Sequence, residues 1–104
     1  MTDSLKQKIA TEKGLIAYFY SDRCAPCISL RPKVSQMVGG GFPGMGLVFI
    51  NSEDHPETTA HFSVFANPAI IVFFEGKEYR RYSKYISINE LGGDIERIYT
   101  MVFE

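Results

Sequence analysis

Short apolar runs along the chain predict three buried strands. The runs are residues 15–21 (LIAYFYS), 47–51 (LVFIN) and 69–75 (AIIVFFE), and all three are rich in β-branched and aromatic side chains. In residues 78–85 (EYRRYSKY), which follow a turn at 75–77, one set of side chains alternates with another: Tyr79, Arg81, Ser83 and Tyr85 against Glu78, Arg80, Tyr82 and Lys84. This alternation predicts a fourth strand, half exposed and at a sheet edge.

Apolar residues at helical spacing precede and follow the first strand. Ser4 can cap a first helix in which Leu5 and Ile9 share a face, and Gly14 is expected to end it. A second helix is predicted from Cys24 to about Val38, and Pro32 should kink it. The composition of residues 39–46 (GGGFPGMG) predicts a flexible loop, and this stretch lacks the Gly-Lys-Ser/Thr ending of a phosphate loop.

Two more helices are predicted in the second half of the chain. Pro56 suits the first turn of a short helix that carries His61, Phe62 and Phe65. A final helix, capped by Ser87 or Asn89, has one apolar face made of Leu91, Ile95, Ile98 and Val102. The order α-β-α-β-α-β-β-α predicts an α/β fold with a largely parallel sheet and an antiparallel hairpin at its end.

Composition and charge limit what kind of protein this is. The 104 residues suffice for a single domain, 1–104, of ordinary apolar content. The net charge of −1 provides no general attraction to nucleic acid or to an anionic membrane, and the apolar runs are too short to span a bilayer. The first 14 residues lack the apolar core of a secretory signal, so we expect a cytoplasmic location.

The chain contains two cysteines, Cys24 and Cys27, in the stretch SDRCAPCISLRP. In a reducing compartment, such a pair indicates redox chemistry or metal binding more than a structural disulfide. Cys24 should follow a strand and open a helix, where the helix dipole and the adjacent Arg23 favour a thiolate nucleophile. Cys27, one turn further, would attack a mixed disulfide on Cys24 and release the product. Ala25 and Pro26 suit the first helical turn between them.

Two other interpretations of the pair compete with redox chemistry. The cysteines could simply pack in the core, as buried cysteines often do. A zinc site normally needs four ligands, and only His55 and His61 could complete it, six residues apart and not on one helix face. We therefore expect no metal and no cofactor.

Several motifs together resemble the thioredoxin family over essentially the whole chain. The strand LIAYFYS leading to Cys24-Ala25-Pro26-Cys27, with Pro32 five residues later, is similar to the family's active-site strand and its proline-kinked helix. Asn67-Pro68 falls where the family has a cis-proline, and Pro68 follows Cys24 by 44 residues (68 − 24), the family's usual spacing. The resemblance implies a thioredoxin-like fold in a shorter version: a central four-stranded mixed sheet flanked by helices, with the N-terminal helix first and the first strand central.

The resemblance also implies an activity and a set of site residues. The family exchanges disulfides with protein substrates through the two cysteines and is restored by an upstream reductase such as thioredoxin reductase. Asn67 and Pro68 would form an edge that hydrogen-bonds the substrate backbone. Arg23, Ala25 and Pro26 would flank that edge beside the cysteines. Pro68 could instead be an ordinary trans proline at a strand entrance.

This sequence departs from the family at positions that matter for the chemistry. Arg23 stands where thioredoxins have tryptophan, and Ala25 replaces the usual glycine. The buried aspartate that is thought to take the proton from the second cysteine aligns with Tyr18, and its lysine companion aligns with Phe49. A tyrosine with a pKa of about 10 is a poor base at neutral pH. A glycine after the fourth strand has no clear counterpart near Lys84.

Three functions remain open on the sequence. The first is a thiol–disulfide oxidoreductase, acting mainly as a reductant because Pro26 is kept. The second is a thioredoxin-fold binding or adaptor module with weak turnover, suggested by the departures. The third is a glutathione-dependent, glutaredoxin-like protein, suggested by residues 91–96 (LGGDIE), although Gly92-Gly93 lies inside a predicted helix. We expect a monomer, because Arg80 and Lys84 on the edge strand disfavour edge pairing.

Overall fold

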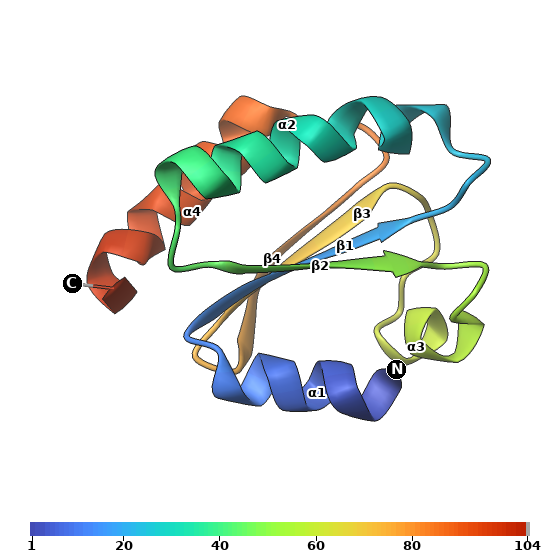
Figure 1. Ribbon diagram of the computed structural model, residues 1–104, viewed down its shortest axis with the longest axis horizontal. Helices are drawn as coiled ribbons and strands as arrows, with labels where there is room; N and C mark the ends of the chain where they lie inside the picture. Colours follow the sequence, from blue (N-terminus) through green and yellow to red (C-terminus); the bar gives the residue numbers. More distant parts are fainter. Residues whose placement is uncertain (104) are drawn as a thin grey trace.

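The computed structural model describes residues 1–103, and its elements follow the predicted order, with the N-terminal helix first (Figure 1). The helices and strands are α1 (Thr2–Thr11), β1 (Gly14–Tyr20), α2 (Ala25–Gly41), β2 (Gly46–Asn51), α3 (Pro56–His61), β3 (Ala69–Phe74), β4 (Lys77–Ser83) and α4 (Ile88–Phe103). Within these residues, no helix combines the length and the apolar character needed to cross a membrane.

The four strands form one mixed sheet in the order β2-β1-β3-β4, so β1 is a central strand, as expected. β1 runs parallel to β2 and antiparallel to β3, and β3 pairs with β4 as an antiparallel hairpin. The prediction of a largely parallel sheet is therefore wrong. A helix of six residues such as α3 is only about 9 Å long, too short to carry the chain back along a strand, so β3 starts at the end where β2 stops.

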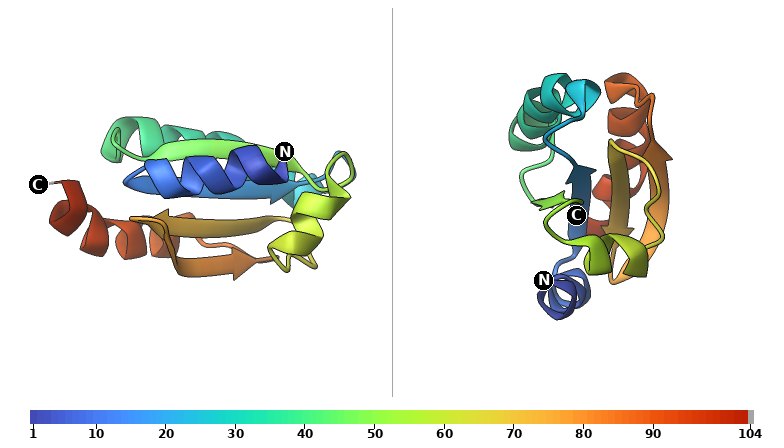
Figure 2. Two further views of the ribbon diagram at one scale, coloured as in Figure 1. Left: turned by 90° about the horizontal axis from the view of Figure 1, so that it is seen from below. Right: turned by 90° about the vertical axis from the view of Figure 1, so that its right-hand side faces the viewer.

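Helices cover both faces of the sheet (Figures 1 and 2): α2 and α4 lie on one face, and α1 and α3 lie on the other. The side chains of β1 alternate between the two resulting cores. Ile16 and Tyr18 pack under α2 and α4, whereas Leu15, Ala17 and Phe19 pack with the α1 side. Because both faces are covered, β1 is a continuous apolar run without polar alternation.

The first helix begins and ends differently from the prediction. α1 starts at Thr2, and the Ser4 hydroxyl donates to the Met1 carbonyl at 2.8 Å from within the helix, so Ser4 is not the cap. α1 ends at Thr11, and Gly14 is instead the first residue of β1. A side chain at position 14 would collide with Met45 and crowd Phe103, so these two side chains would have to shift to admit any residue larger than glycine.

The glycine-rich stretch after Val38 is not a loop throughout. α2 continues through Gly41, and the Phe42 N–H donates to the Val38 carbonyl at 2.9 Å. Phe42 is buried and packs edge to face on Tyr99 of α4, with ring centres 5.2 Å apart. This tertiary contact fixes the helix end against the poor helix propensity of three successive glycines.

The ends of α3 and α4 also refine the prediction. α3 stops at His61, so Phe62 follows the helix and packs against the α1-side core, while Phe65 lies outside the helix with 90% of its surface exposed. Before α4, the Ser87 hydroxyl accepts from the Glu90 N–H at 3.2 Å, so Ser87 supplies the capping oxygen.

β4 is the edge strand, but its side chains do not alternate as predicted. The register shifts between Val72 and Phe73, so one extra residue of β4 sits opposite that step. As a result, Tyr79 and Tyr82 both pack against the core under α2 and α4, and Arg80 and Arg81 are both exposed.

A buried carboxylate fastens α4 to this edge strand. The Tyr82 hydroxyl donates to Asp94 at 2.7 Å, and Arg97 and Arg80 pair with the same carboxylate. The Tyr82 hydrogen bond, with help from the two arginines, holds the pKa of Asp94 below its usual range. Asp94 is 3% exposed, so its charge is held entirely by these partners.

The glycine run of α2 gives a stability prediction. A methyl group at Gly40 would meet no atom within 4 Å, and its backbone is helical without a positive φ. Gly40→Ala should raise the free energy of unfolding by about 0.5–1 kcal/mol, because alanine loses less backbone entropy in a helix. Urea denaturation of the variant and the wild type checks this value.

Gly76 provides the matched control for this substitution. Its φ is +83°, a conformation that L side chains rarely adopt, although its surroundings are equally open. Gly76→Ala should therefore lower the unfolding free energy by about 1 kcal/mol. Equal effects of the two substitutions would contradict the assignment of Gly40 to an unstrained helix.

Candidate active site

The two cysteines lie where the central strand β1 passes into α2. The chain leaves β1 at Tyr20, and Cys24 is the N-cap residue of α2 with extended backbone angles (φ −99°, ψ 99°). The Cys24 N–H donates to the Ser21 carbonyl at 3.2 Å, which fixes the approach to the helix. The rigid central strand thus holds the first sulfur at a helix N-terminus, as the sequence predicted.

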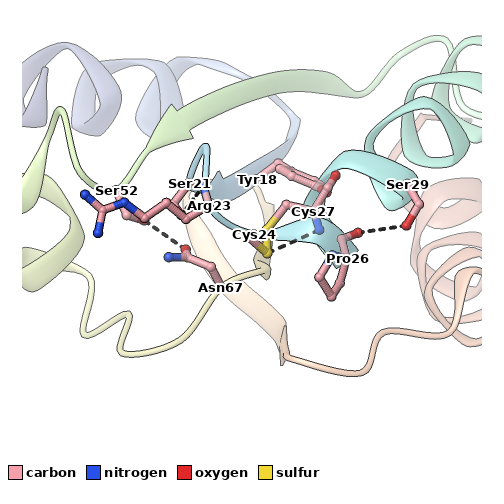
Figure 3. The surroundings of a disulfide bond; sticks show 9 residues. All are labelled: Tyr18, Ser21, Arg23, Cys24, Pro26, Cys27, Ser29, Ser52 and Asn67. Carbon is pink, nitrogen blue, oxygen red and sulfur yellow. Dashed lines mark hydrogen bonds between the residues drawn. A yellow bond between two sulfur atoms is a disulfide. The ribbon is translucent and has the colours of Figure 1, made fainter.

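Cys24 and Cys27 are joined by a disulfide, with 5.2 Å between their Cα atoms (Figure 3). Cys24 is partly exposed, whereas Cys27 is 2% exposed. A substrate disulfide can therefore reach the Cys24 sulfur. The Cys27 sulfur is shielded from solvent and can react only with Cys24 beside it. This asymmetry matches the roles expected for a nucleophile and a resolving thiol.

A hydrogen bond within the pair favours negative charge on the outer sulfur. The Cys27 N–H donates to Cys24 Sγ at 3.2 Å, in the first turn of α2. This N–H is one of the unpaired donors at a helix N-terminus, where the helix dipole also stabilises an anion. In the dithiol form, the same contacts would stabilise the Cys24 thiolate, which is the reactive species.

Ala25 and Pro26 form the exposed first turn of α2 between the cysteines. Pro26 lacks an N–H, which costs nothing at this end of a helix because the group would have no partner there. The Ser29 hydroxyl donates to the Pro26 carbonyl at 3.3 Å. The turn between the two cysteines is therefore exposed.

Asn67 belongs to the surroundings of the disulfide (Figure 3), and Pro68 follows it directly before β3. The Asn67–Pro68 peptide bond is cis, and Pro68 is buried. The Ser52 hydroxyl donates to Asn67 Oδ1 at 3.0 Å, and the Ser52 N–H donates to the Tyr20 carbonyl at 2.7 Å. Asn67 is thereby tied to the loop after β2, and Figure 3 shows it on the side of the cysteines opposite to Ser29.

Arg23 does not face the sulfur atoms. Its guanidinium extends toward Ser52 (Figure 3) and lies 3.6 Å from the Glu53 carboxylate, with the arginine side chain 87% exposed. The positive charge that the sequence analysis assigned to Cys24 is therefore shared with an acid. The hydrogen bond that Cys24 Sγ accepts comes instead from the first turn of α2.

Tyr18 has a role that the sequence did not predict. Its hydroxyl donates to the Cys27 carbonyl at 2.7 Å, and its side chain is fully buried. Burial raises the pKa of Tyr18 to about 12, although the charge of Arg31 opposes the shift. The phenol therefore stays protonated at neutral pH and positions α2 against β1; it does not accept the Cys27 proton.

Arg31 is a further site residue that the sequence analysis missed. Its guanidinium lies 4.2 Å from the ring centre of Phe49 and 5.1 Å from that of Tyr20. Phe49 in turn packs edge to face on Tyr18 at 5.4 Å. The Arg31 guanidinium thus lies over Phe49, the position where the family pattern has lysine. Arg31 belongs to α2 and directly precedes Pro32. Only the packing of α2 on β1 and β2 reveals this placement.

Comparisons with known proteins agree with this geometry. The family model described as thioredoxin matches residues 1–97. The thioredoxin-like protein YdfQ of Bacillus subtilis (strain 168) is 28% identical over 98 residues, which cover 94% of this chain and 87% of that protein.

Solved structures give the same result. Thioredoxin 1 from Thermosipho africanus TCF52B superposes with a TM-score of 0.78 at 26% identity, covering 86% of this chain and 99% of the other. A mutant thioredoxin from Halobacterium salinarum NRC-1 gives a TM-score of 0.85 at 19% identity, covering 95% of this chain and 86% of the other. The second likeness concerns the fold alone.

The position of Tyr18 gives a prediction about pH dependence. Tyr18→Phe should lower the unfolding free energy by about 1 kcal/mol, because one buried hydrogen bond is lost. The rate of disulfide exchange should keep its pH profile between about pH 5 and pH 9, because a group with a pKa of about 12 does not titrate there. Stopped-flow exchange with a small disulfide measures the profile.

Tyr82→Phe is the matched control, since it removes a similar hydrogen bond at Asp94 without touching the cysteines. Both variants should be destabilised, and neither should change the profile. A profile that shifts in Tyr18→Phe alone would make Tyr18 a proton carrier and contradict this assignment.

Proposed function

This chain belongs to the thioredoxin family and is a thiol–disulfide oxidoreductase, and we propose that Cys24 and Cys27 carry its reaction with protein disulfides. The observation that supports these roles best is the asymmetry of the pair. Cys24 is partly exposed at the N-terminus of α2 and accepts a hydrogen bond there, whereas Cys27 is buried beneath it. The accessible Cys24 is thus suited to be the nucleophile, and the buried Cys27 is suited to be the resolving thiol.

The proposed reaction has two exchange steps. The Cys24 thiolate attacks one sulfur of a substrate disulfide, and the other substrate sulfur leaves as a thiolate that takes up a proton. Cys27 loses its proton and attacks Cys24 Sγ, which breaks the mixed disulfide and releases the second substrate thiolate. The substrate gains two electrons, and the cysteine pair loses them in forming its own disulfide. Of the two protons that the substrate thiolates take up, one is the proton released by Cys27 and the other comes from water.

The substrate segment around the reacting disulfide would contact five residues near Cys24: Arg23, Ala25, Pro26, Asn67 and Pro68. The residues before Pro68 are held by Ser52, so their backbone can pair with an extended substrate segment. The exposed Ala25-Pro26 turn would accept the chain on the other side of the sulfur.

We further propose that the protein acts as a reductant. Cys24 Sγ accepts a hydrogen bond from the first turn of α2, while Arg23 shares its charge with Glu53, so we expect the dithiol to be favoured less strongly than in a strong oxidant. A reductant needs an upstream donor of two electrons, such as thioredoxin reductase. It would act as a monomer in a reducing compartment, and the cytoplasm fits this requirement.

An adaptor with weak turnover is the second candidate, and one observation favours it. Tyr18 and Phe49 provide no buried base for Cys27, so the resolving step could be slow. A slow resolving step would prolong the mixed disulfide and favour holding a partner over turnover. The glutathione-dependent alternative lacks such support, because Asp94 is buried and bound by Tyr82 and Arg97.

Cys27→Ser tests the two-step reaction. With the resolving thiol removed, Cys24 should still attack a substrate disulfide, and the mixed disulfide should accumulate as a covalent adduct. Cys24→Ser is the matched control and should form no adduct. Non-reducing gel electrophoresis and intact-mass measurement detect the adduct, and equal behaviour of the two variants would contradict the assigned roles.

The reduction potential of the Cys24–Cys27 couple tests the direction. Equilibration with glutathione buffers, followed by alkylation of free thiols, should give a value near about −270 mV, the range of reducing thioredoxins. A value between about −180 and −120 mV would identify an oxidant or isomerase instead. If no intramolecular disulfide forms at any buffer ratio, the adaptor function replaces the oxidoreductase reaction.

A further inference from the structure

A groove lies between the start of α2 and the connection from β4 to α4, and Pro26, which stands between the two cysteines in the chain, is one of its lining residues. Its volume is about 420 Å³. The two segments that form its walls run side by side at one end of the molecule (Figures 1 and 2). Pro26 and Pro68 both line it, so the groove shares residues with the proposed substrate-binding surface around Cys24.

The floor of the groove is apolar, and two lysines stand on its walls. Pro26, Ser29, Leu30 and Lys33 come from one face of α2, at helical spacing. Lys84 and Tyr85 line the opposite wall, and Tyr85 is 97% exposed. A segment lying in the groove would cover apolar surface and meet a positive charge on each side.

Backbone geometry holds Lys84 at the active site. Its N–H donates to the Pro68 carbonyl at 2.9 Å, which places its backbone next to the cis-proline. Its φ is +65°, a left-handed conformation that is unfavourable for a lysine. A cationic side chain therefore occupies a backbone position that glycine would fill without strain.

The charges around the groove have one sign. None of the nine lining residues is acidic, and within residues 1–103 neither Lys33 nor Lys84 lies within ion-pair distance of a carboxylate. Beyond the cysteines, the loop after β2 carries Glu53 beside Arg23. The groove therefore carries two lysines without an acidic partner, whereas Arg23 on the other side of the cysteines is paired with Glu53.

From this geometry we propose that the groove binds an acidic segment of the disulfide substrate, adjacent to the cysteine that Cys24 attacks. Lys33 and Lys84 would each pair with an Asp or Glu side chain, and the apolar floor would cover the segment between them. The proposal rests on the exchange function of Cys24. It adds a substrate class: proteins whose reactive disulfide is flanked by acidic residues.

Peptide disulfides of a single design test this preference. Each peptide carries one cysteine, disulfide-bonded to 2-mercaptoethanol and flanked on both sides by Glu, Ser or Lys, and is mixed with the reduced protein. At low ionic strength the Glu peptide should react roughly three- to tenfold faster than the Ser peptide. Each exposed ion pair changes an equilibrium by up to about fivefold, and the Glu peptide can form two such pairs, with Lys33 and Lys84. The preference should disappear in about 1 M salt, where the Debye length is about 3 Å.

Variants locate the preference in the groove. Lys84→Gly and Lys33→Ser should each lower the ratio of the Glu-peptide rate to the Ser-peptide rate severalfold. Glycine suits the positive φ of position 84, so this variant should fold at least as well as the wild type. The double variant Lys33→Glu, Lys84→Glu should reverse the order and prefer the Lys peptide.

Lys77→Glu is the control for net charge. Lys77 begins β4 and pairs with Phe74, at the opposite end of the sheet from Pro68 and the cysteines. This variant changes the total charge as much as Lys84→Glu and should keep the wild-type order of peptides. If it abolishes the preference, the effect belongs to the whole molecule and the groove proposal is wrong.

The remaining outcomes separate this proposal from the exchange function. Equal rates for the three peptides would overturn the acidic-segment proposal and leave the Cys24 reaction intact. If no peptide reacts, the exchange function fails, and the groove proposal fails with it. A dimer in sedimentation that Lys84→Glu dissociates, together with equal peptide rates, would assign the groove to a second copy of the chain.

Discussion

The hydrogen bond from the Cys27 N–H to Cys24 Sγ is the interaction on which the chemistry of this protein depends. It exists because Cys24 occupies the N-cap of α2, where the first helical N–H groups have no other partner. The position of that N-cap is set in turn by β1, a central strand buried on both faces and paired on both edges. The position of the reactive Cys24 sulfur at the surface is therefore set by β1, the strand that is buried on both faces and paired on both edges.

The same strand shows how this chain departs from the acid–lysine arrangement of its family. Tyr18 uses its hydroxyl to bind the Cys27 carbonyl, so the residue that would be a base is a hydrogen-bond donor. Phe49 completes an aromatic cluster with it, and Arg31 covers that cluster from α2. The inner side of the site is thus held by packing and one hydrogen bond, and its cation comes from a helix that is continuous with the reactive cysteine.

Local sequence rules failed where a tertiary contact opposed them. The glycines after Val38 predicted a loop, but the burial of Phe42 against Tyr99 keeps them in α2. The alternation in residues 78–85 predicted two separate faces, but an extra residue in β4 turns both Tyr79 and Tyr82 toward the core. In each case aromatic burial outweighs a backbone preference of about 1 kcal/mol or less per residue.

The sequence by itself determined the order of the elements and the outer and inner cysteines, and its resemblance to the thioredoxin family pointed to the cis peptide bond at Pro68. These features depend on spacing along the chain: apolar runs, two cysteines three positions apart, and the distance from Cys24 to Pro68. Only the tertiary structure decided the direction of β3, the partners of Tyr18 and Arg31, and the meeting of Lys33 with Lys84 across one groove. Such contacts join residues far apart in the chain, and no local pattern records which side chains the packing of helices on a sheet brings together.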